Sequence, residues 1–255
     1  MERPDLPLPR VSEARAAERA TSLAAHLDRL HRGRSAEAIL RAAIDSLFRG
    51  RIALVSSFGA DSAVLLHLVG SVNPATPVIF IDTGQLFDET LAYRDELVSR
   101  IGLSDVRSTA PRPERLARLD PENFLWQTNP DLCCRIRKVE PLAAALGDFP
   151  AWISGRKRFQ NAQRANLPLF EGDGRRIKVN PLAEWTAEDL ESYRREHDLP
   201  AHPLVKHGYL SIGCMPCTSR VRPGEDPRAG RWRGLQKTEC GIHVRDTLEH
   251  EGSGI

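Results

Sequence analysis

Short apolar runs alternate with longer amphipathic stretches between residues 51 and 197, and this alternation restricts the chain to one class of fold. The apolar runs, which we interpret as strands, cover 51–58, 76–84, 103–110, 151–155 and 176–181. The predicted helices cover 61–70, 87–102, about 135–146 and 186–197, the last opened by the capping-box pair Thr186 and Asp189. Strands that alternate with helices form parallel sheets. We therefore predict an α/β fold, a parallel sheet with helices on both faces.

The alternating region is flanked by two segments of different composition. Residues 1–10 form a proline-containing leader, and helices are expected over 12–31 and 35–48. Beyond about residue 200, Gly, Pro and Arg replace the apolar periodicity. Within one functional domain, we expect an N-terminal helical segment over 1–50, an α/β domain over 51–200 and an irregular C-terminal extension over 201–255.

Composition places the chain among globular proteins. Hydrophobic residues make up 41% of it and charged residues 27%, which suits a packed core rather than a disordered chain. The net charge of +2 indicates no general affinity for polyanions, so we expect no nucleic-acid partner. We find neither a secretory signal nor a long apolar run, so we expect a cytoplasmic protein without a membrane segment. The oligomeric state is left open, a homo-oligomer included.

Two polar turns follow neighbouring predicted strands. SSFGADS (56–62) joins the first strand to its helix, and IDTG (81–84) ends the next strand. The carboxyl ends of parallel strands meet at one edge of a sheet, and free N–H groups at a helix start favour anions, so we expect a ligand crevice there. An ordinary strand–helix turn is the alternative, since short Gly/Ser motifs give many false matches. The candidate binding residues are Ser57, Phe58, Gly59, Ser62 and Thr83.

Four of the five cysteines fall into two pairs. Cys133 and Cys134 are adjacent, and Cys214 and Cys217 have the C-x-x-C spacing of a chelating site. In a reducing compartment, such pairs favour metal binding over disulfides. Four thiolates suit either a tetrahedral zinc ion or a [4Fe–4S] cluster, whose separate iron corners accommodate adjacent cysteines with less strain. Burial of Cys133 and Cys134 as small apolar residues is the alternative.

Cys240 is the one cysteine left over. It lies in KTECGIH (237–243), near Lys237, His243 and Arg245. Cations next to a cysteine favour the nucleophilic thiolate. A thiol without a resolving partner cannot complete a two-electron cycle within its own subunit, so an adduct on Cys240 would need an external dithiol for its release. A free cysteine without a role is the alternative.

Basic residues cluster near these sites. GRKRFQNAQR (155–164) contains four basic residues and no acid, and 219–246 contains seven basic and four acidic residues. Solvated charge explains most such runs, but Arg is also suited to bidentate recognition of sulfate and phosphate. The stretch from Gly155 follows a predicted strand, so we expect it to face the same crevice.

Together these motifs resemble the assimilatory adenylylsulfate reductases of the iron–sulfur type, within the phosphoadenylylsulfate reductase family. The matching segments are SFGADS, IDTG followed by LF, CCRIRK (133–138), the Gly155 loop, SIGCMPCT (211–218), GEDPRAGRW (224–232) and ECGIH (239–243). They extend from about residue 56 to residue 243. Each motif is weak alone, but the combination of Cys-Cys, C-x-x-C and ECGIH is highly specific.

The resemblance implies an adenine-nucleotide α-hydrolase-like fold whose nucleotide-binding domain is 51–200. It also implies a thioredoxin-dependent reduction of adenosine 5′-phosphosulfate to sulfite and AMP, in sulfate assimilation and cysteine biosynthesis. Cys240 would attack the sulfate sulfur and carry an S-sulfonate until thioredoxin or a similar dithiol protein frees sulfite. Lys138, which would link a cluster to the substrate, and His243 would assist it.

The resemblance also implies which residues bind the cofactor and the substrate. The [4Fe–4S] ligands would be Cys133, Cys134, Cys214 and Cys217. The substrate-binding residues would be Ser57, Phe58, Gly59, Ser62, Thr83, Gly155, Arg164, Arg228 and Arg231, with the three arginines on the phosphosulfate.

Three alternatives stay open at this stage. A reductase acting on 3′-phosphoadenosine 5′-phosphosulfate, or on both nucleotides, would share most motifs, although most such enzymes lack the two cysteine pairs. A tRNA-thiolating enzyme of the ATP-pyrophosphatase superfamily would need a broad basic face, which the net charge of +2 disfavours. A zinc-ribbon-like binding module would hold zinc and no iron.

Overall fold

The computed structural model describes residues 9–243. The predicted leader therefore lies mostly outside the described residues, and its last two residues, Pro9 and Arg10, already belong to helix α1. Among the described residues, no helix combines the length and the apolar character needed to cross a bilayer.

A six-stranded sheet in the order β3-β2-β1-β4-β6-β5 forms the centre of the molecule. Its strands are β1 (Ile52–Ser56), β2 (Val78–Ile81), β3 (Val106–Thr109), β4 (Ala151–Ile153), β5 (Phe170–Asp173) and β6 (Arg176–Val179). Five strands are parallel, as predicted. Neighbouring strands pair in a defined register, for example Leu54 of β1 opposite Val78 of β2. The order reverses direction between β1 and β4, which is where open α/β sheets bind ligands.

The sheet is mixed rather than purely parallel, because β5 pairs antiparallel with β6. The sequence analysis missed β5. A two-residue loop joins the two strands, and its first residue, Gly174, has a φ of +59°. Gly at that position is a recognised hairpin signal, and it was present in the sequence.

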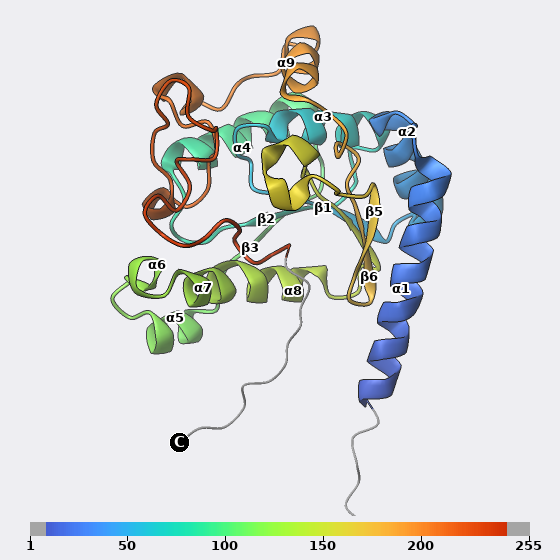
Figure 1. Cartoon of the computed structure of the whole chain (residues 1–255), viewed down its shortest axis with the longest axis horizontal. Coiled ribbons are helices and arrows are strands. Elements are labelled where there is room, and N and C mark those ends of the chain that lie inside the picture. The colour runs from blue at the N-terminus through green and yellow to red at the C-terminus, as the bar shows by residue number, and fades with distance from the viewer. Residues whose placement is uncertain (1–8, 244–255) are drawn as a thin grey trace, which may run out of the picture.

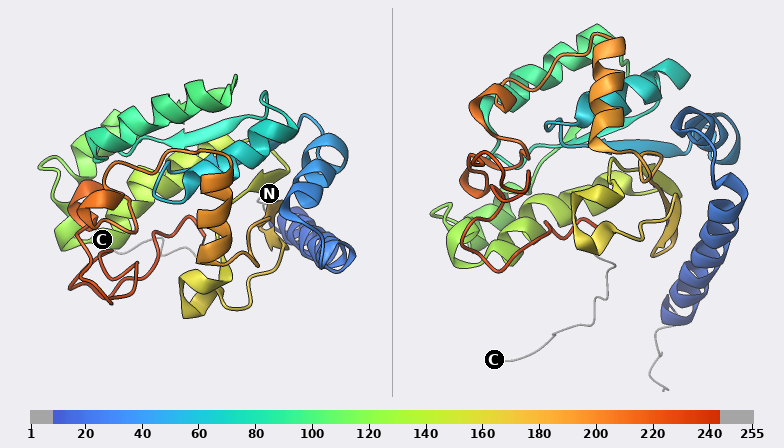
Figure 2. Two further views of the ribbon diagram at one scale, coloured as in Figure 1. Left: turned by 90° about the horizontal axis from the view of Figure 1, so that it is seen from above. Right: turned by 45° about the horizontal axis from the view of Figure 1, so that its top comes forward.

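Helices cover both faces of the sheet (Figure 1). They are α1 (Pro9–His31), α2 (Ala36–Arg41), α3 (Ser62–Val72), α4 (Asp88–Ile101), α5 (Pro113–Leu119), α6 (Leu125–Thr128), α7 (Pro130–Cys134), α8 (Glu140–Leu146) and α9 (Ala187–Glu196). Figure 2 shows α3 and α4 on one side of the sheet and the green α5–α8 region on the other. This is the predicted arrangement, and Thr186 and Asp189 form the predicted capping box of α9.

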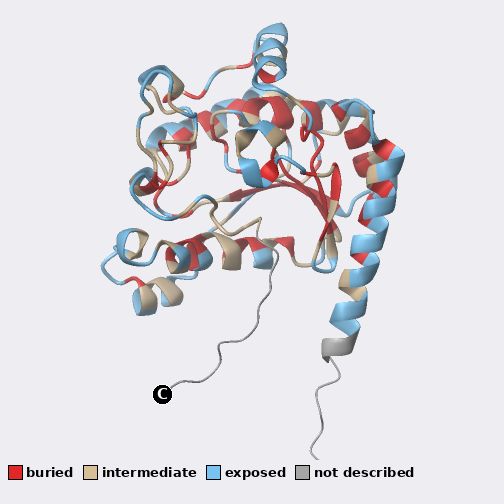
Figure 3. Ribbon diagram, in the orientation of Figure 1, coloured by how far each residue is buried: buried red, intermediate tan, exposed pale blue. Residues whose placement is uncertain are grey.

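Alternating side chains of the strands supply the two cores. Ile52 and Leu54 of β1 belong to the larger core on the α3 face, whereas Ala53 points to the opposite face. There Trp152 of β4 packs with Leu142 of α8. Figure 3 shows this as a sheet whose central strands β1, β2, β4 and β6 are mostly buried, with exposed residues on the outer faces of the helices. The buried sheet is a rigid base for the loops at its carboxyl edge.

Helix α1 packs along the antiparallel edge of the sheet (Figure 1). A Cβ built on Gly172 would lie 2.6 Å from Oγ1 of Thr21, so glycine permits this close approach. Asp28 of α1 accepts a hydrogen bond from the Leu169 backbone N–H at 2.7 Å. The helix therefore covers an edge that would otherwise expose unpaired backbone groups.

The C-terminal extension is irregular, as predicted, and turns back toward the carboxyl edge of the sheet (Figure 2). The backbone N–H of Met215 donates to the Gln85 carbonyl after β2 at 2.8 Å. A Cβ on Gly230 would lie 2.1 Å from the Ser219 carbonyl oxygen, so only glycine fits there. These contacts place the C-x-x-C motif beside the IDTG turn.

Candidate active site

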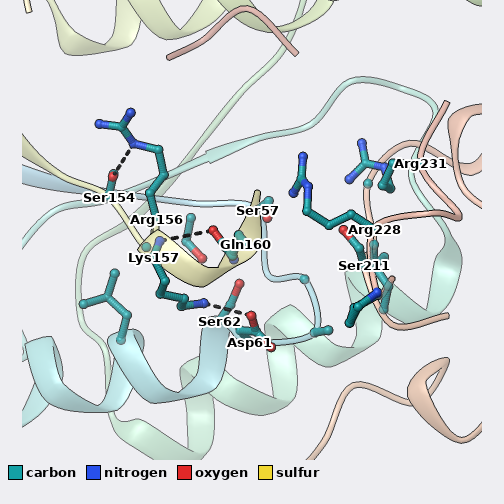
Figure 4. Close-up of a pocket in the computed structure, with 18 of the residues that line it drawn as sticks. Ser57, Asp61, Ser62, Ser154, Arg156, Lys157, Gln160, Ser211, Arg228 and Arg231 are labelled. Carbon is teal, nitrogen blue, oxygen red and sulfur yellow. Dashed lines mark hydrogen bonds and ion pairs between the residues drawn. The ribbon is translucent and has the colours of Figure 1, made fainter. Parts of the chain in front are cut away.

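A cavity of about 480 Å³ lies at the carboxyl ends of β1, β2 and β4. Its lining includes most of the residues predicted from the sequence: Ser57, Gly59, Ser62, Thr83, Lys138, Gly155, Arg164, Cys214, Arg228, Arg231, Cys240 and His243. Figure 4 shows Ser57 and Ser62 between Arg156 on one side and Arg228 and Arg231 on the other. Segments that are far apart in the sequence thus meet in one site.

The loop between β1 and α3 lines this cavity, and the amino end of α3 borders it as well. Phe58 has a φ of +47°, and its ring is fully buried against Phe80 at 5.4 Å between centroids. Phe58 therefore shapes the loop from the core and does not line the cavity, unlike the other predicted residues of the loop. Gly59 approaches the extension closely, since a Cβ there would lie 3.2 Å from the Ile212 carbonyl oxygen.

The four paired cysteines lie close enough to influence one another's ionisation, and one of them, Cys214, lines the cavity. Cys133 and Cys134 end α7, and Cys214 and Cys217 flank a single 3₁₀ turn (Met215–Cys217). All four are buried and none forms a disulfide. The Cys214 Sγ lies 3.2 Å from Oγ1 of Thr83.

The chemistry of this quartet fits an iron–sulfur cluster. Burial, aided by the neighbouring Cys134, raises the pKa of Cys133 to about 12, and burial likewise raises that of Cys134 to about 11. Bare thiolates are thus costly at Cys133 and Cys134, and a cationic iron core would offset that cost, whereas Lys138 and a hydrogen bond from Thr83 outweigh burial and lower the pKa of Cys214. Within residues 9–243, no three Cys, His, Asp or Glu side chains gather around one point as a single-ion site requires. A cluster, which offers a separate iron to each thiolate, accommodates the adjacent Cys133 and Cys134 with less strain than one zinc ion does.

A single π-helical turn (Arg135–Val139) follows the adjacent cysteines. Such turns change the direction in which side chains leave a helix and are frequent at functional sites. Lys138 lies on this turn and lines the cavity. Burial alone would lower the pKa of Lys138, but the sulfurs of Cys214, Cys240 and Cys134 together raise it. Lys138 is therefore a buried cation that interacts electrostatically with Cys134 and Cys214 of the quartet and with Cys240.

Arg137 lies on the same π-helical turn and links this turn to two other segments of the site. It donates to the Thr83 carbonyl at 2.9 Å and to the Asp120 carboxylate at 2.7 Å. Asp120 also accepts the backbone N–H groups of Phe124 and Leu125. The Arg137 and Asp120 side chains are only 5% and 2% exposed. The pair thus ties the Thr83 turn, the 120–125 loop and the cysteine helix together.

An Asp120→Ala variant is expected to lose about 3–5 kcal/mol of unfolding free energy, because it leaves the Arg137 guanidinium buried and unpaired. Asp95→Ala is a suitable control, since the Asp95 side chain that pairs with Arg94 is 68% exposed and its removal should cost less than about 1 kcal/mol. Urea unfolding of both variants measures the difference. Equal losses would contradict this role of the buried pair.

Residues 237–241 hold Cys240 in the lining of the cavity. The Lys237 ammonium pairs with Asp131 of α7, the helix that ends in the adjacent cysteines. Cys240 packs against the small cluster of Cys214, Cys217 and Trp232. Gly241 has a φ of +86°, a backbone conformation that side chains rarely adopt. The thiol is thereby placed near the paired cysteines, and it stays outside the buried set.

The three predicted anion-binding arginines differ in their contacts. Arg164 forms a two-point ion pair with Glu239, and Arg228 lies 3.8 Å from the same carboxylate. Arg231 stacks on Trp232 with its guanidinium carbon 4.4 Å from the ring centre, and its buried Nε has no hydrogen-bond partner among the described residues. Arg231 is therefore the one of the three with an unused buried donor.

His243 lines the cavity and stacks on Trp152 with ring centres 5.8 Å apart. Burial, followed by the charge of Arg156, holds the pKa of His243 well below its ordinary value. The ring is therefore neutral near pH 7 and contributes no positive charge to Cys240. Its buried Nδ1 has no partner within residues 9–243.

Sequence reasoning missed three polar residues of the site. Glu239 binds Arg164, Asp61 pairs with Lys157 at 2.8 Å, and Gln160 accepts from the Lys157 backbone N–H (Figure 4). Glu239 was within the ECGIH motif, but its partner is 75 positions away. The pairing of such distant residues is not visible in a single sequence.

Comparisons with known proteins agree with this geometry. Residues 51–220 match the family model described as the phosphoadenosine phosphosulfate reductase domain. The chain is 55% identical to an adenosine 5′-phosphosulfate reductase of Chelativorans sp. over 87% of this chain and 91% of that protein. It is 46% identical to the protein of that name from Mycobacterium tuberculosis over 75% of this chain and 76% of the other.

Solved structures show the same fold. A phosphoadenylyl-sulfate reductase of Candida auris, in a phosphate complex, aligns with a TM-score of 0.64 at 27% identity over 78% of this chain and 96% of that one. An FMN adenylyltransferase of Candida glabrata aligns with a TM-score of 0.51 at 18% identity over 80% of this chain and 74% of the other, which indicates a shared fold alone. From the family match and the relatives above 45% identity together, the chain belongs to the phosphoadenosine phosphosulfate reductase family.

Proposed function

We propose that this chain is an oxidoreductase that reduces adenosine 5′-phosphosulfate to sulfite and AMP during sulfate assimilation. The observation that carries the proposal is that the amino end of α3 borders the same cavity that Cys240, Lys138 and Arg231 line. The first feature suits the nucleotide phosphate and the second suits a sulfate. Relatives named for this activity, at 46–55% identity over most of their length, support the choice of substrate.

In the proposed first step, the Cys240 thiolate attacks the sulfate sulfur. A sulfur–sulfur bond forms, the bond from that sulfur to the phosphate oxygen breaks, and AMP leaves with the electron pair. Lys138 and Arg231 hold the charge that develops on the departing oxygens, as fixed cations do in a water-poor site. No activated water is required, since positioning and charge are sufficient to favour this displacement.

In the proposed second step, an external dithiol protein such as thioredoxin supplies the two electrons. One of its thiolates attacks Sγ of Cys240 and displaces sulfite, and its second thiol then resolves the mixed disulfide. The product is an oxidised dithiol protein and a restored Cys240 thiol. The paired cysteines are buried and would be occupied by the cofactor, so an external reductant fits the structure better than an internal one.

Cys133, Cys134, Cys214 and Cys217 would hold a [4Fe–4S] cluster, which would supply a fixed charge and a structural anchor beside Lys138. The purified protein is expected to be brown and to contain about four iron atoms per chain. Cys134→Ser should lose most of the iron, whereas Cys240→Ser should retain it. Elemental analysis that finds one zinc and no iron would contradict the cluster.

Steady-state turnover tests the proposed function. With reduced thioredoxin, the protein should release equal amounts of sulfite and AMP from adenosine 5′-phosphosulfate. The ratio of kcat/KM for this substrate and for the 3′-phosphorylated nucleotide defines its selectivity. Turnover of the 3′-phosphorylated nucleotide alone would replace the proposed substrate, and absence of AMP release from both would contradict reductase activity.

A further inference from the structure

The residues that follow Cys240 pack on a different part of the molecule from Cys240 itself. Cys240 packs against the small cluster that contains Trp232, whereas Ile242 packs against the apolar cluster around Trp152, on the α8 face of the sheet. Between the two lies Gly241, whose φ of +86° allows the chain to turn from one cluster to the other. The segment that carries the nucleophile is therefore held by contacts on both sides of that turn.

His243 adds the second contact of this segment with Trp152. The two rings are stacked, with their planes 9° apart and their centres separated by 5.8 Å. Offset stacks at this separation are favourable for aromatic side chains. The stack uses the face of the imidazole ring and leaves its nitrogens to other partners, and the buried Nδ1 has none within residues 9–243. The indole thus holds the ring of His243 without using its polar atoms.

Trp152 is itself held in one orientation by charged side chains of the β5–β6 hairpin. Its Nε1 donates to the Asp173 carboxylate at 2.8 Å, and the Lys178 ammonium lies 4.6 Å from the centre of its ring. Lys178 is only 2% exposed and pairs with Glu171 at 3.3 Å and with Asp173 at 3.4 Å. Buried charges require such partners. Here the partners also fix the indole against which the terminal segment packs.

We propose that Trp152 is a positioning residue, whose indole provides the surface on which Ile242 and His243 dock and thereby holds Cys240 in the cavity. Trp152 acts through this segment and not on the substrate, because it is not among the described residues that line the cavity. The inference rests on the proposed function for the reaction that the docking serves. The docking itself is a property of the protein without substrate.

Alkylation of Cys240 by iodoacetamide tests the docking in the absence of substrate. In the cluster-loaded protein the four paired cysteines would be occupied, and mass spectrometry of the Cys240 peptide follows this one thiol. Trp152→Leu removes the stacking partner, so Cys240 should react about 2- to 10-fold faster, as expected for the loss of one aromatic pair. His243→Ala should give a similar increase. The double variant should react no faster than the faster single one, because both changes remove the same contact.

Two further variants make the result specific. Trp185→Leu breaks an aromatic contact with Tyr193, 5.6 Å between ring centres, outside the cavity lining, and should leave the alkylation rate unchanged. Trp152→Phe keeps a ring that can stack on His243, so its rate should stay within about twofold of the wild type. Together with His243→Ala, Trp152→Phe carries the test if Trp152→Leu does not fold.

The same variants are then measured with adenosine 5′-phosphosulfate. A misplacement of about 1 Å costs about 100-fold in rate, so Trp152→Leu should slow S-sulfonate formation by roughly 10- to 100-fold at saturating substrate. In the His243→Ala background, the same change should slow it by less than about twofold further, since Trp152 acts through the docked segment. Trp152→Phe should recover most of the rate that Trp152→Leu loses.

Unchanged alkylation of Cys240 in both Trp152→Leu and His243→Ala would overturn the inference, because the segment would then be held without the stack. Multiplied effects of the two changes in the double variant would overturn it as well. If alkylation responds as expected but the wild-type protein forms no S-sulfonate, the docking is supported and the proposed function fails. The two failures are therefore distinguishable.

Discussion

Replacement of Cys240 by serine is expected to abolish sulfite release while leaving AMP binding unchanged. A serine hydroxyl cannot form the sulfur–sulfur bond of the proposed intermediate, so kcat should fall by about 10⁴-fold or more. Cys240 lies outside the buried quartet and lines the cavity, so the change should not disturb the core. Sulfite assays and AMP titration measure the two effects separately.

The control for this variant is its iron content. Cys240→Ser should keep the visible absorbance of the wild type, because the four cysteines that would hold the cluster are untouched. Residual sulfite release within tenfold of the wild type would show that another group carries the sulfur.

Replacement of Lys138 by methionine is the second prediction with a large effect. Lys138 is a cation that interacts with both the quartet and Cys240, and burial makes its charge effective there. Removal of one fixed donor from a developing oxyanion costs about 10²–10³-fold in kcat, and we expect a loss in that range. The variant keeps the length of the side chain, so packing in the π-helical turn is preserved.

Lys206→Met is the matched control, because the Lys206 side chain is exposed and Lys206 is not among the residues that line the cavity. Its kcat should equal that of the wild type. If Lys138→Met changes kcat by less than about threefold, the fixed cation has no part in the chemical step.

Most of the fold follows from the sequence, because hydrophobic periodicity reports local structure. The five parallel strands and the Thr186 capping box are set by nearby residues and were predicted. Strand β5 was missed because FEGD carries no strong apolar alternation, and burial of Gly172 against α1 decides its place. A tertiary contact of this kind overrides local propensity.

The sequence predicted most of the residues that line the candidate site. It predicted less well which contacts each residue makes and which charge it carries. The motifs identified the cavity lining, but the side-chain direction of Phe58 depends on a positive φ that its residue type does not suggest. The engagement of Arg164 by Glu239 depends on long-range pairing. The neutrality of His243 depends on burial, which a sequence does not report.

The central claim is that Cys240 accepts the sulfite group from the substrate, while the other four cysteines bind the cofactor. The most direct measurement is mass spectrometry of protein incubated with adenosine 5′-phosphosulfate in the absence of any reductant. We expect one sulfite group per chain, located on the peptide that contains Cys240 and released by reduced thioredoxin. A sulfite group on any other residue, or on none, would contradict the claim.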